Sequence, residues 1–176
     1  TVSNLGITLA EASRRVVIVD SDLRKPRQTR IFNGGSGPGL SRFLSSHMDP
    51  SEVVKPTSVP NLQLITSGPL PANPIELLTS ERMDILVAYL KRSFDYVLFD
   101  APPLLAVSDA LAMGPIADAI ILVVRGGQTP IPALKQAKQK LDAHKLKCLG
   151  IILNGVDLVE QDGYYARQYY NYSKAE

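Results

Sequence analysis

The chain has 176 residues, with 19 Lys and Arg against 17 Asp and Glu and a formal net charge of +2. A near-neutral chain without a lysine block gives no case for a nucleic-acid partner, and a single cysteine excludes an internal disulfide. The length suits one domain, and the longest apolar stretch is shorter than the roughly 20 residues that span a bilayer.

The first dozen residues predict a helix that lacks a start signal. Leu5, Leu9 and Ala12 share one helical face, and neither a capping residue nor a strand precedes them. A phosphate loop of the form G-x-x-x-x-G-K-[ST], which joins a first strand to a first helix, does not occur in the sequence. We therefore expect the chain to begin just after such a loop, without the first strand.

The segment VVIVDSDLRKP, residues 16–26, is the most informative of the chain. Val16–Val19 predicts a buried strand of a parallel sheet, because such a strand needs apolar residues on both faces. Asp20 and Asp22 follow directly, and Arg24 comes after them. Ligands of open α/β sheets bind outside the carboxyl ends of the strands, so these carboxylates lie where a nucleotide's magnesium or a reacting hydroxyl would need them.

The middle of the chain predicts a series of short elements. Its glycine-rich loop, residues 34–39, has no strand before it and no Lys-Ser/Thr after it, which favours a flexible turn over a phosphate-binding loop. The expected elements are a helix at Leu40–Ser46, a short helix from Asp49, a strand at Asn61–Thr66, and a long helix at Ile75–Arg92 that packs by Leu78, Ile85, Leu86 and Leu90.

A second strand that ends in an acid follows this helix. Tyr96–Phe99 is apolar and leads into Asp100 and then Ala-Pro-Pro. This is the Walker B pattern, whose carboxylate holds magnesium directly or through water. For either strand alone, an aspartate that caps the next helix is the alternative. Two such strands, one of them extended as Asp-x-Asp-x-Arg, favour a nucleotide site that holds Mg²⁺.

The second half of the chain continues the alternation. The expected elements are a helix capped by Ser108-Asp109 that runs to Met113, a buried strand at Ala119–Val124, an amphipathic helix at Ile131–Ala143 and a last strand at Leu149–Leu153. This order predicts an α/β fold with a doubly wound, mostly parallel sheet, P-loop NTPase-like but lacking the first strand and the phosphate loop. We place this domain at residues 1–160 and a tyrosine-rich tail at residues 161–176.

Asn154 follows the last predicted strand. Its amide offers both a donor and an acceptor, so it could read the edge of a purine base. Asn154 and Asp157 have the Asn-x-x-Asp spacing of GTP-binding proteins, but Gly155 occupies the position of that motif's lysine. A turn asparagine is the open alternative, because Asn-Gly is a common turn pair.

Five of the seven tyrosines lie in the tail, within the sequence YYARQYYNYSKAE. No helical or strand period organises them, and one alternative is that they pack the terminus onto the domain or onto another subunit. Beside a phosphoryl-transfer site they favour phosphate acceptors, and each phosphate would add about −1.5 to −2 charge. The predicted acceptors are Tyr164, Tyr165, Tyr169, Tyr170 and Tyr172.

With these features together, the chain resembles the cytoplasmic kinase domain of the bacterial tyrosine autokinases that regulate capsule and exopolysaccharide synthesis. VVIVDSDLRKP is similar to that family's Walker A′ motif, and YVLFDAPP is similar to its Walker B motif. The segments at Pro38–Ser41 and Thr66–Ser80 and the tyrosine-rich end also resemble the family. The departure is the missing Walker A motif, so Thr1 is not expected to be the residue that binds magnesium.

The resemblance implies an ATP-dependent protein-tyrosine autokinase, a transferase with ATP and Mg²⁺ as cofactors. Asp20, Asp22 and Asp100 are the predicted catalytic residues: Asp22 and Asp100 hold magnesium, and Asp20 accepts the proton of an incoming tyrosine hydroxyl. Arg24 and Asn154 are the predicted nucleotide contacts, although Arg24 could instead lie at a subunit contact or hold an acidic group. Without Walker A, this chain is expected to bind ATP weakly, to lack autophosphorylation, and to be less stable than the complete domain.

The resemblance also implies an assembly and a location. In the family, kinase domains form a ring-like homo-oligomer in which one subunit's tail enters its neighbour's site. A membrane-anchored activator or a fused transmembrane segment activates the kinase, which places it in the cytoplasm at the inner face of the plasma membrane. Two other functions stay open: a partitioning or division-site ATPase, although the tail lacks the basic surface or amphipathic helix that such proteins often carry, and a non-catalytic regulatory module.

Overall fold

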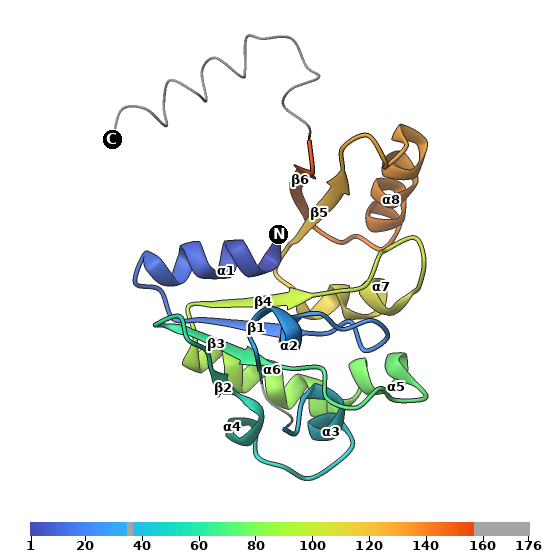
Figure 1. Cartoon of the computed structure of the whole chain (residues 1–176). Helices are drawn as coiled ribbons and strands as arrows, with labels where there is room; N and C mark the ends of the chain where they lie inside the picture. Colours follow the sequence, from blue (N-terminus) through green and yellow to red (C-terminus); the bar gives the residue numbers. More distant parts are fainter. Residues whose placement is uncertain (35–36, 157–176) are drawn as a thin grey trace, which may run out of the picture.

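The computed structural model describes residues 1–34 and 37–156, in which helices and strands alternate (Figure 1). The strands are β1 (Val16–Asp20), β2 (Lys55–Pro56), β3 (Leu62–Ile65), β4 (Tyr96–Asp100), β5 (Ile120–Arg125) and β6 (Cys148–Asn154). The helices are α1 (Val2–Glu11), α2 (Gln28–Ile31), α3 (Leu40–Leu44), α4 (Pro50–Val53), α5 (Pro74–Leu78), α6 (Glu81–Ser93), α7 (Asp109–Met113), the 3₁₀ helix η1 (Gly114–Ile116) and α8 (Ile131–Ala143). Within these ranges, no helix has both the length and the apolar character that crossing a membrane requires.

Two sheets form the framework. The larger has the strand order β2-β3-β1-β4, and β1 runs parallel to both of its neighbours. β2 is a two-residue antiparallel strand at the edge, which the sequence did not predict. β5 and β6 form a separate parallel pair. Among the described residues no strand joins β4 to β5, so the predicted mostly parallel sheet is confirmed but is divided in two.

β1 is the centre of the larger sheet, and all five of its residues are buried, which confirms the burial predicted for Val16–Val19. Val17 and Val19 belong to a large apolar cluster that includes residues of α3 and α6. Val16 and Ile18 belong to a second cluster that includes Ala10 of α1. The two clusters are separate because side chains alternate between the faces of a strand. Helices therefore cover both faces of β1, which confirms the doubly wound arrangement.

α1 packs closely on the sheet through small side chains. Its buried residues are Ser3, Gly6 and Ala10. A Cβ on Gly6 would lie 2.7 Å from Cδ1 of Ile18, so glycine permits this close approach. The predicted helix is present, but its buried face differs from the prediction, because Leu5 and Leu9 are half-buried and Ala12 is exposed.

The segment predicted as one helix at Ile75–Arg92 forms two helices, α5 and α6, so that prediction was wrong. The chain breaks at Thr79 and Ser80, whose hydroxyls donate to carbonyl oxygens of the preceding turn at 2.9 and 2.7 Å. Ser80 has an extended backbone and begins α6 as its N-cap. Ile85 is exposed rather than packed, because α6 buries a different face. The predicted core positions that are buried are Leu78, Leu86 and Leu90.

The last two strands both expose apolar side chains, although the first of them was predicted to be buried. α8 lies along one side of the β5–β6 pair (Figure 1), and alternate residues of β5 are exposed. The exposed apolar side chains of the pair are Ile121, Val123, Leu149, Ile151 and Leu153. The strand predicted at Ala119–Val124 is therefore present, but the expectation that it is buried was wrong, since burial needs cover on both faces. The predicted tail and the boundary at residue 160 lie outside the described residues.

Candidate active site

Two aspartates meet where the central strands end. Asp20 is the last residue of β1, Asp100 is the last residue of β4, and the two are register partners. Asp20 is fully buried, and its Oδ2 accepts hydrogen bonds from the backbone N–H groups of Arg27 and Gln28 at 3.1 and 2.9 Å. Its Oδ1 is also buried and has no hydrogen-bond partner among the residues that the structure describes. A buried carboxylate oxygen without a partner is costly, and a ligand that satisfied it would be favoured.

Burial raises the pKa of Asp20 to about 6. The negative charges of Asp100 and Asp22 raise this pKa further, while the backbone hydrogen bonds from Gln28 and Arg27 lower it in part. A carboxyl group that titrates near neutral pH suits the acceptance and return of a proton at physiological pH. The environment of Asp20 is therefore compatible with the predicted role of a base.

Hydrogen bonds hold both the carboxylate and the backbone carbonyl of Asp100. Its Oδ2 accepts from the side-chain Nε2 of Gln28 at 2.5 Å, and the same amide accepts from the hydroxyl of Ser3 at 2.9 Å through Oε1. Its carbonyl oxygen accepts from the backbone N–H and the hydroxyl of Ser21 at 3.0 and 2.7 Å. These bonds join β4 to the loop after β1. No sequence pattern singles out Gln28 or Ser3, because their contact depends on how α1 and α2 pack.

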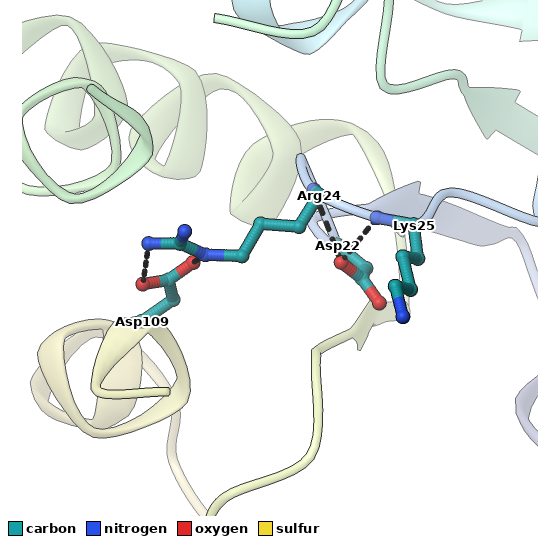
Figure 2. A network of polar contacts seen from close by, with 4 residues as sticks. All are labelled: Asp22, Arg24, Lys25 and Asp109. Carbon is teal, nitrogen blue, oxygen red and sulfur yellow. Dashed lines mark hydrogen bonds and ion pairs between the residues drawn. The ribbon is translucent and has the colours of Figure 1, made fainter. Parts of the chain in front are cut away.

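Asp22 shapes the loop that follows β1. Its Oδ1 accepts from the backbone N–H groups of Arg24 and Lys25 at 3.1 and 2.9 Å (Figure 2). Its side chain therefore closes a turn of the kind that aspartates favour. The turn keeps this second carboxylate next to the strand end that carries Asp20.

Arg24 is paired with an acidic residue from another part of the chain. Its guanidinium binds the carboxylate of Asp109 in α7 through two hydrogen bonds of 2.7 and 3.0 Å (Figure 2). Asp109 is fully buried, whereas the Arg24 side chain is 42% exposed. The expectation that Arg24 could hold an acidic group is thus met, and its role as a nucleotide contact stays a prediction. Sequence reasoning took Asp109 only as part of a helix cap.

Asn154 lies in the smaller sheet, at the end of β6. Its Nδ2 donates to the hydroxyl of Thr1 at 3.1 Å, and its Oδ1 accepts from the backbone N–H of Gly155 at 2.9 Å. Gly155 has a φ of +65°, which suits a turn. The geometry agrees with the turn alternative, and a base-reading role stays a prediction.

Two segments that are distant in the sequence pack together just after the carboxyl end of β3. The backbone N–H groups of Leu40 and Ser41 donate to the carbonyl oxygens of Thr66 and Ser67 at 2.7 and 2.9 Å. A Cβ on Gly39 would lie only 2.2 Å from the backbone nitrogen of Gly68. Glycine is therefore required for this contact, which ties the start of α3 to the carboxyl end of β3.

The acidic residues at the strand ends do not by themselves form a complete metal site in the described part of the chain. Within residues 1–34 and 37–156, no three His, Cys, Asp or Glu side chains are grouped so that they could hold a metal ion. Mg²⁺ commonly uses one or two carboxylates and takes its other ligands from phosphates and water. Asp22 and Asp100 could supply these one or two carboxylate ligands. The five predicted acceptor tyrosines lie outside the described residues.

The fold and these strand ends define an α/β domain of the P-loop NTPase type, and comparison with known sequences identifies the family. Residues 1–148 match the AAA domain family. The chain is 37% identical over 167 residues to tyrosine-protein kinase YwqD of Bacillus subtilis (strain 168), covering 94% of this chain and 70% of that protein. It is 32% identical over 163 residues to the putative tyrosine-protein kinase CapB of Staphylococcus aureus, covering 93% and 72%. The chain belongs to the bacterial tyrosine-protein kinase family.

Solved structures agree with this assignment. The kinase domain of Escherichia coli tyrosine kinase ETK superposes with a TM-score of 0.87 at 31% identity, covering 93% of this chain and 64% of that one. The septum site-determining protein MinD of Pyrococcus horikoshii, complexed with Mg-ADP, has a TM-score of 0.72 at 20% identity, which shows the shared fold alone. The chain spans only 24% of tyrosine-protein kinase wzc of Salmonella typhimurium.

Proposed function

We propose that this chain forms part of the catalytic domain of an ATP-dependent protein-tyrosine autokinase. The observation that carries the proposal is the pair of register partners Asp20 and Asp100 at the carboxyl ends of adjacent parallel strands. One buried oxygen of Asp20 has no hydrogen-bond partner in the described part of the chain. Nucleotides bind at this end of open α/β sheets, and the two relatives compared above are named as tyrosine-protein kinases, one of them as putative.

Each carboxylate has a role in the proposed reaction. Asp22 and Asp100 would hold the magnesium of ATP, and Asp20 would accept the proton of the tyrosine hydroxyl whose oxygen bonds to the γ-phosphorus as ADP leaves. The bound Mg-ATP supplies the phosphoryl group and the positive charge that neutralises its oxygens. The protein's part is to hold these groups in place, which is the main source of catalysis in phosphoryl transfer.

The proposed substrate is the tyrosine cluster of the chain's own tail. In the proposed assembly, the kinase domains form a ring-like homo-oligomer, and the tail of one subunit reaches the site of its neighbour. A membrane-anchored activator or a fused transmembrane segment would hold the domain in the cytoplasm at the inner face of the plasma membrane. There it would regulate exopolysaccharide or capsule synthesis and export. The partitioning-ATPase alternative rests on a likeness of fold alone, so we do not favour it.

The test uses the protein at its complete natural length, incubated with ATP and Mg²⁺, with phosphotyrosine located by mass spectrometry. We expect Asp22→Asn to lower phosphate incorporation by roughly a hundredfold, in the range found when one charge-stabilising group is removed from an active site. Asp118→Asn is the matched control, because Asp118 is 90% exposed and pairs only with Lys91 among the described residues. Unchanged incorporation in Asp22→Asn, or no phosphotyrosine in the parent, would contradict the proposal.

A further inference from the structure

One buried residue contacts both strand-end carboxylates, one through its backbone and the other through its side chain. Gln28, the first residue of α2, is 2% exposed. Its backbone N–H donates to Asp20 at 2.9 Å, and its side-chain Nε2 donates to Asp100 at 2.5 Å. Its Oε1 accepts from the hydroxyl of Ser3 at 2.9 Å. Gln28 thus connects the ends of β1 and β4 to the first turn of α1.

The chemistry of these partners fixes the orientation of the amide. An ionised carboxylate can only accept hydrogen bonds, so the NH₂ group of Gln28 must face Asp100 and its oxygen must face Ser3. A hydrogen bond to a charged acceptor in a buried setting is stronger than one between neutral groups. The amide therefore holds Oδ2 of Asp100 in one direction, and it partly offsets the repulsion between the carboxylates of Asp100 and Asp20.

We propose that Gln28 is a positioning residue that orients the Asp100 carboxylate for magnesium. Because Gln28 also contacts Ser3, the orientation of Asp100 depends on the position of the start of α1. This inference rests on the proposed function, because it takes Asp100 as a ligand of the nucleotide's metal ion. Gln28 itself touches neither metal nor nucleotide. Its contribution is confined to the metal-dependent part of nucleotide binding, since its side chain acts through Asp100.

Ser3 connects Gln28 to the beginning of α1. α1 packs on β1 and β3 through buried small residues, and Ser3 is the buried residue closest to its beginning. A shift at the start of α1 moves the hydroxyl that restrains Gln28, and the amide then has more freedom to turn away from Asp100. The carboxylate thereby responds to whatever contacts the beginning of α1.

The experiment measures binding instead of catalysis. Using the protein at its complete natural length, isothermal titration calorimetry compares ADP with Mg²⁺ against ADP with EDTA. Gln28→Met keeps the size and apolar burial of the side chain but removes both amide bonds. We expect it to weaken Mg-ADP binding about tenfold and to leave metal-free ADP binding unchanged, since a hydrogen bond to a charged group contributes on that scale. Ser3→Ala, which leaves the bond to Asp100 in place, should weaken only Mg-ADP, by a smaller factor.

Gln63→Met is the matched control, because Gln63 is half-buried in β3, away from the strand ends. It should leave both affinities unchanged. Equal weakening of Mg-ADP and metal-free ADP in Gln28→Met would indicate a general structural role and overturn the inference, and so would unchanged Mg-ADP binding. A parent protein whose ADP affinity does not depend on Mg²⁺ would refute the metal role of Asp100 and the inference with it. If Mg-ADP binds as expected but no phosphotyrosine forms, the proposed kinase function fails while the positioning role holds.

Discussion

Asp20→Asn should make the stability of the protein less sensitive to pH. Asp20 is fully buried at the end of β1, and burial raises its pKa from 3.8 to about 6 in the folded state. A raised pKa means that the folded state prefers the neutral carboxyl more than the unfolded chain does. This favourable contribution is present below the unfolded pKa and is lost as the pH rises through the folded pKa. Asparagine cannot ionise, so the variant does not lose this stability as the pH rises.

The size of the effect follows from the shift. A difference of about two pKa units, at about 1.4 kcal/mol for each unit, corresponds to roughly 3 kcal/mol above pH 7. The free energy of unfolding of the variant, minus that of the parent, should therefore rise by about 2 to 3 kcal/mol between about pH 4 and about pH 8. Any constant offset from the altered hydrogen bonding adds equally to this difference at every pH and leaves its pH dependence unchanged.

Urea unfolding at a series of pH values measures this difference. EDTA should be present and nucleotide absent, because a bound cation would favour the ionised carboxylate and reduce the effect. Asp118→Asn serves as the control, and its difference from the parent should show no comparable rise, because Asp118 is exposed. A difference for Asp20→Asn that stays constant over the whole pH range would refute the reasoning about burial.

Three other outcomes are expected. Gly39→Ala should lower the free energy of unfolding, measured with urea, by about 1 to 3 kcal/mol, because its Cβ would collide with the Gly68 backbone. The control is Gly37→Ala, whose Cβ would meet no atom of the described residues within 4 Å and which should change the free energy of unfolding little. Arg24→Met should lower the melting temperature by leaving the buried Asp109 carboxylate unpaired, and adding Asp109→Asn should recover part of the loss; no recovery would contradict the pairing argument. Changing all five tail tyrosines to Phe should remove most phosphate from the full-length protein, and mass spectrometry that finds it elsewhere would contradict the acceptor assignment; the positions are Tyr164, Tyr165, Tyr169, Tyr170 and Tyr172.

The central part of the fold could be predicted because its signals are local. The apolar run at Val16–Val19 is long enough to form a strand, and the aspartate that follows it predicts a ligand site at the end of that strand. The same holds for the strand that ends in Asp100, so the two acids could be expected at one edge of the sheet. Their meeting follows from parallel pairing alone and needs no knowledge of the surrounding side chains.

The remaining features depend on contacts between distant segments. Gln28 and Ser3 lie 25 residues apart, and Arg24 and Asp109 lie 85 residues apart, so no periodicity relates either pair. The break in the predicted helix at Ile75–Arg92 depends on hydroxyl bonds at two positions that helical spacing does not exclude. The burial of β5 depends on which elements cover it, and a run of apolar residues does not contain that information.

The register of β1 against β4 sets the spacing of charge as well as the pairing of backbone groups. Val19 pairs with Phe99 and Asp20 pairs with Asp100, so the carboxylates are aligned by the same ladder that aligns the core valines. A slip of one residue would turn the Asp20 side chain to the opposite face and bring valine to its place. Under the proposed function, faulty strand pairing would therefore separate the carboxylates that the reaction needs even in a compact, well-packed molecule, so kinase activity of the full-length protein would report on correct pairing in this sheet.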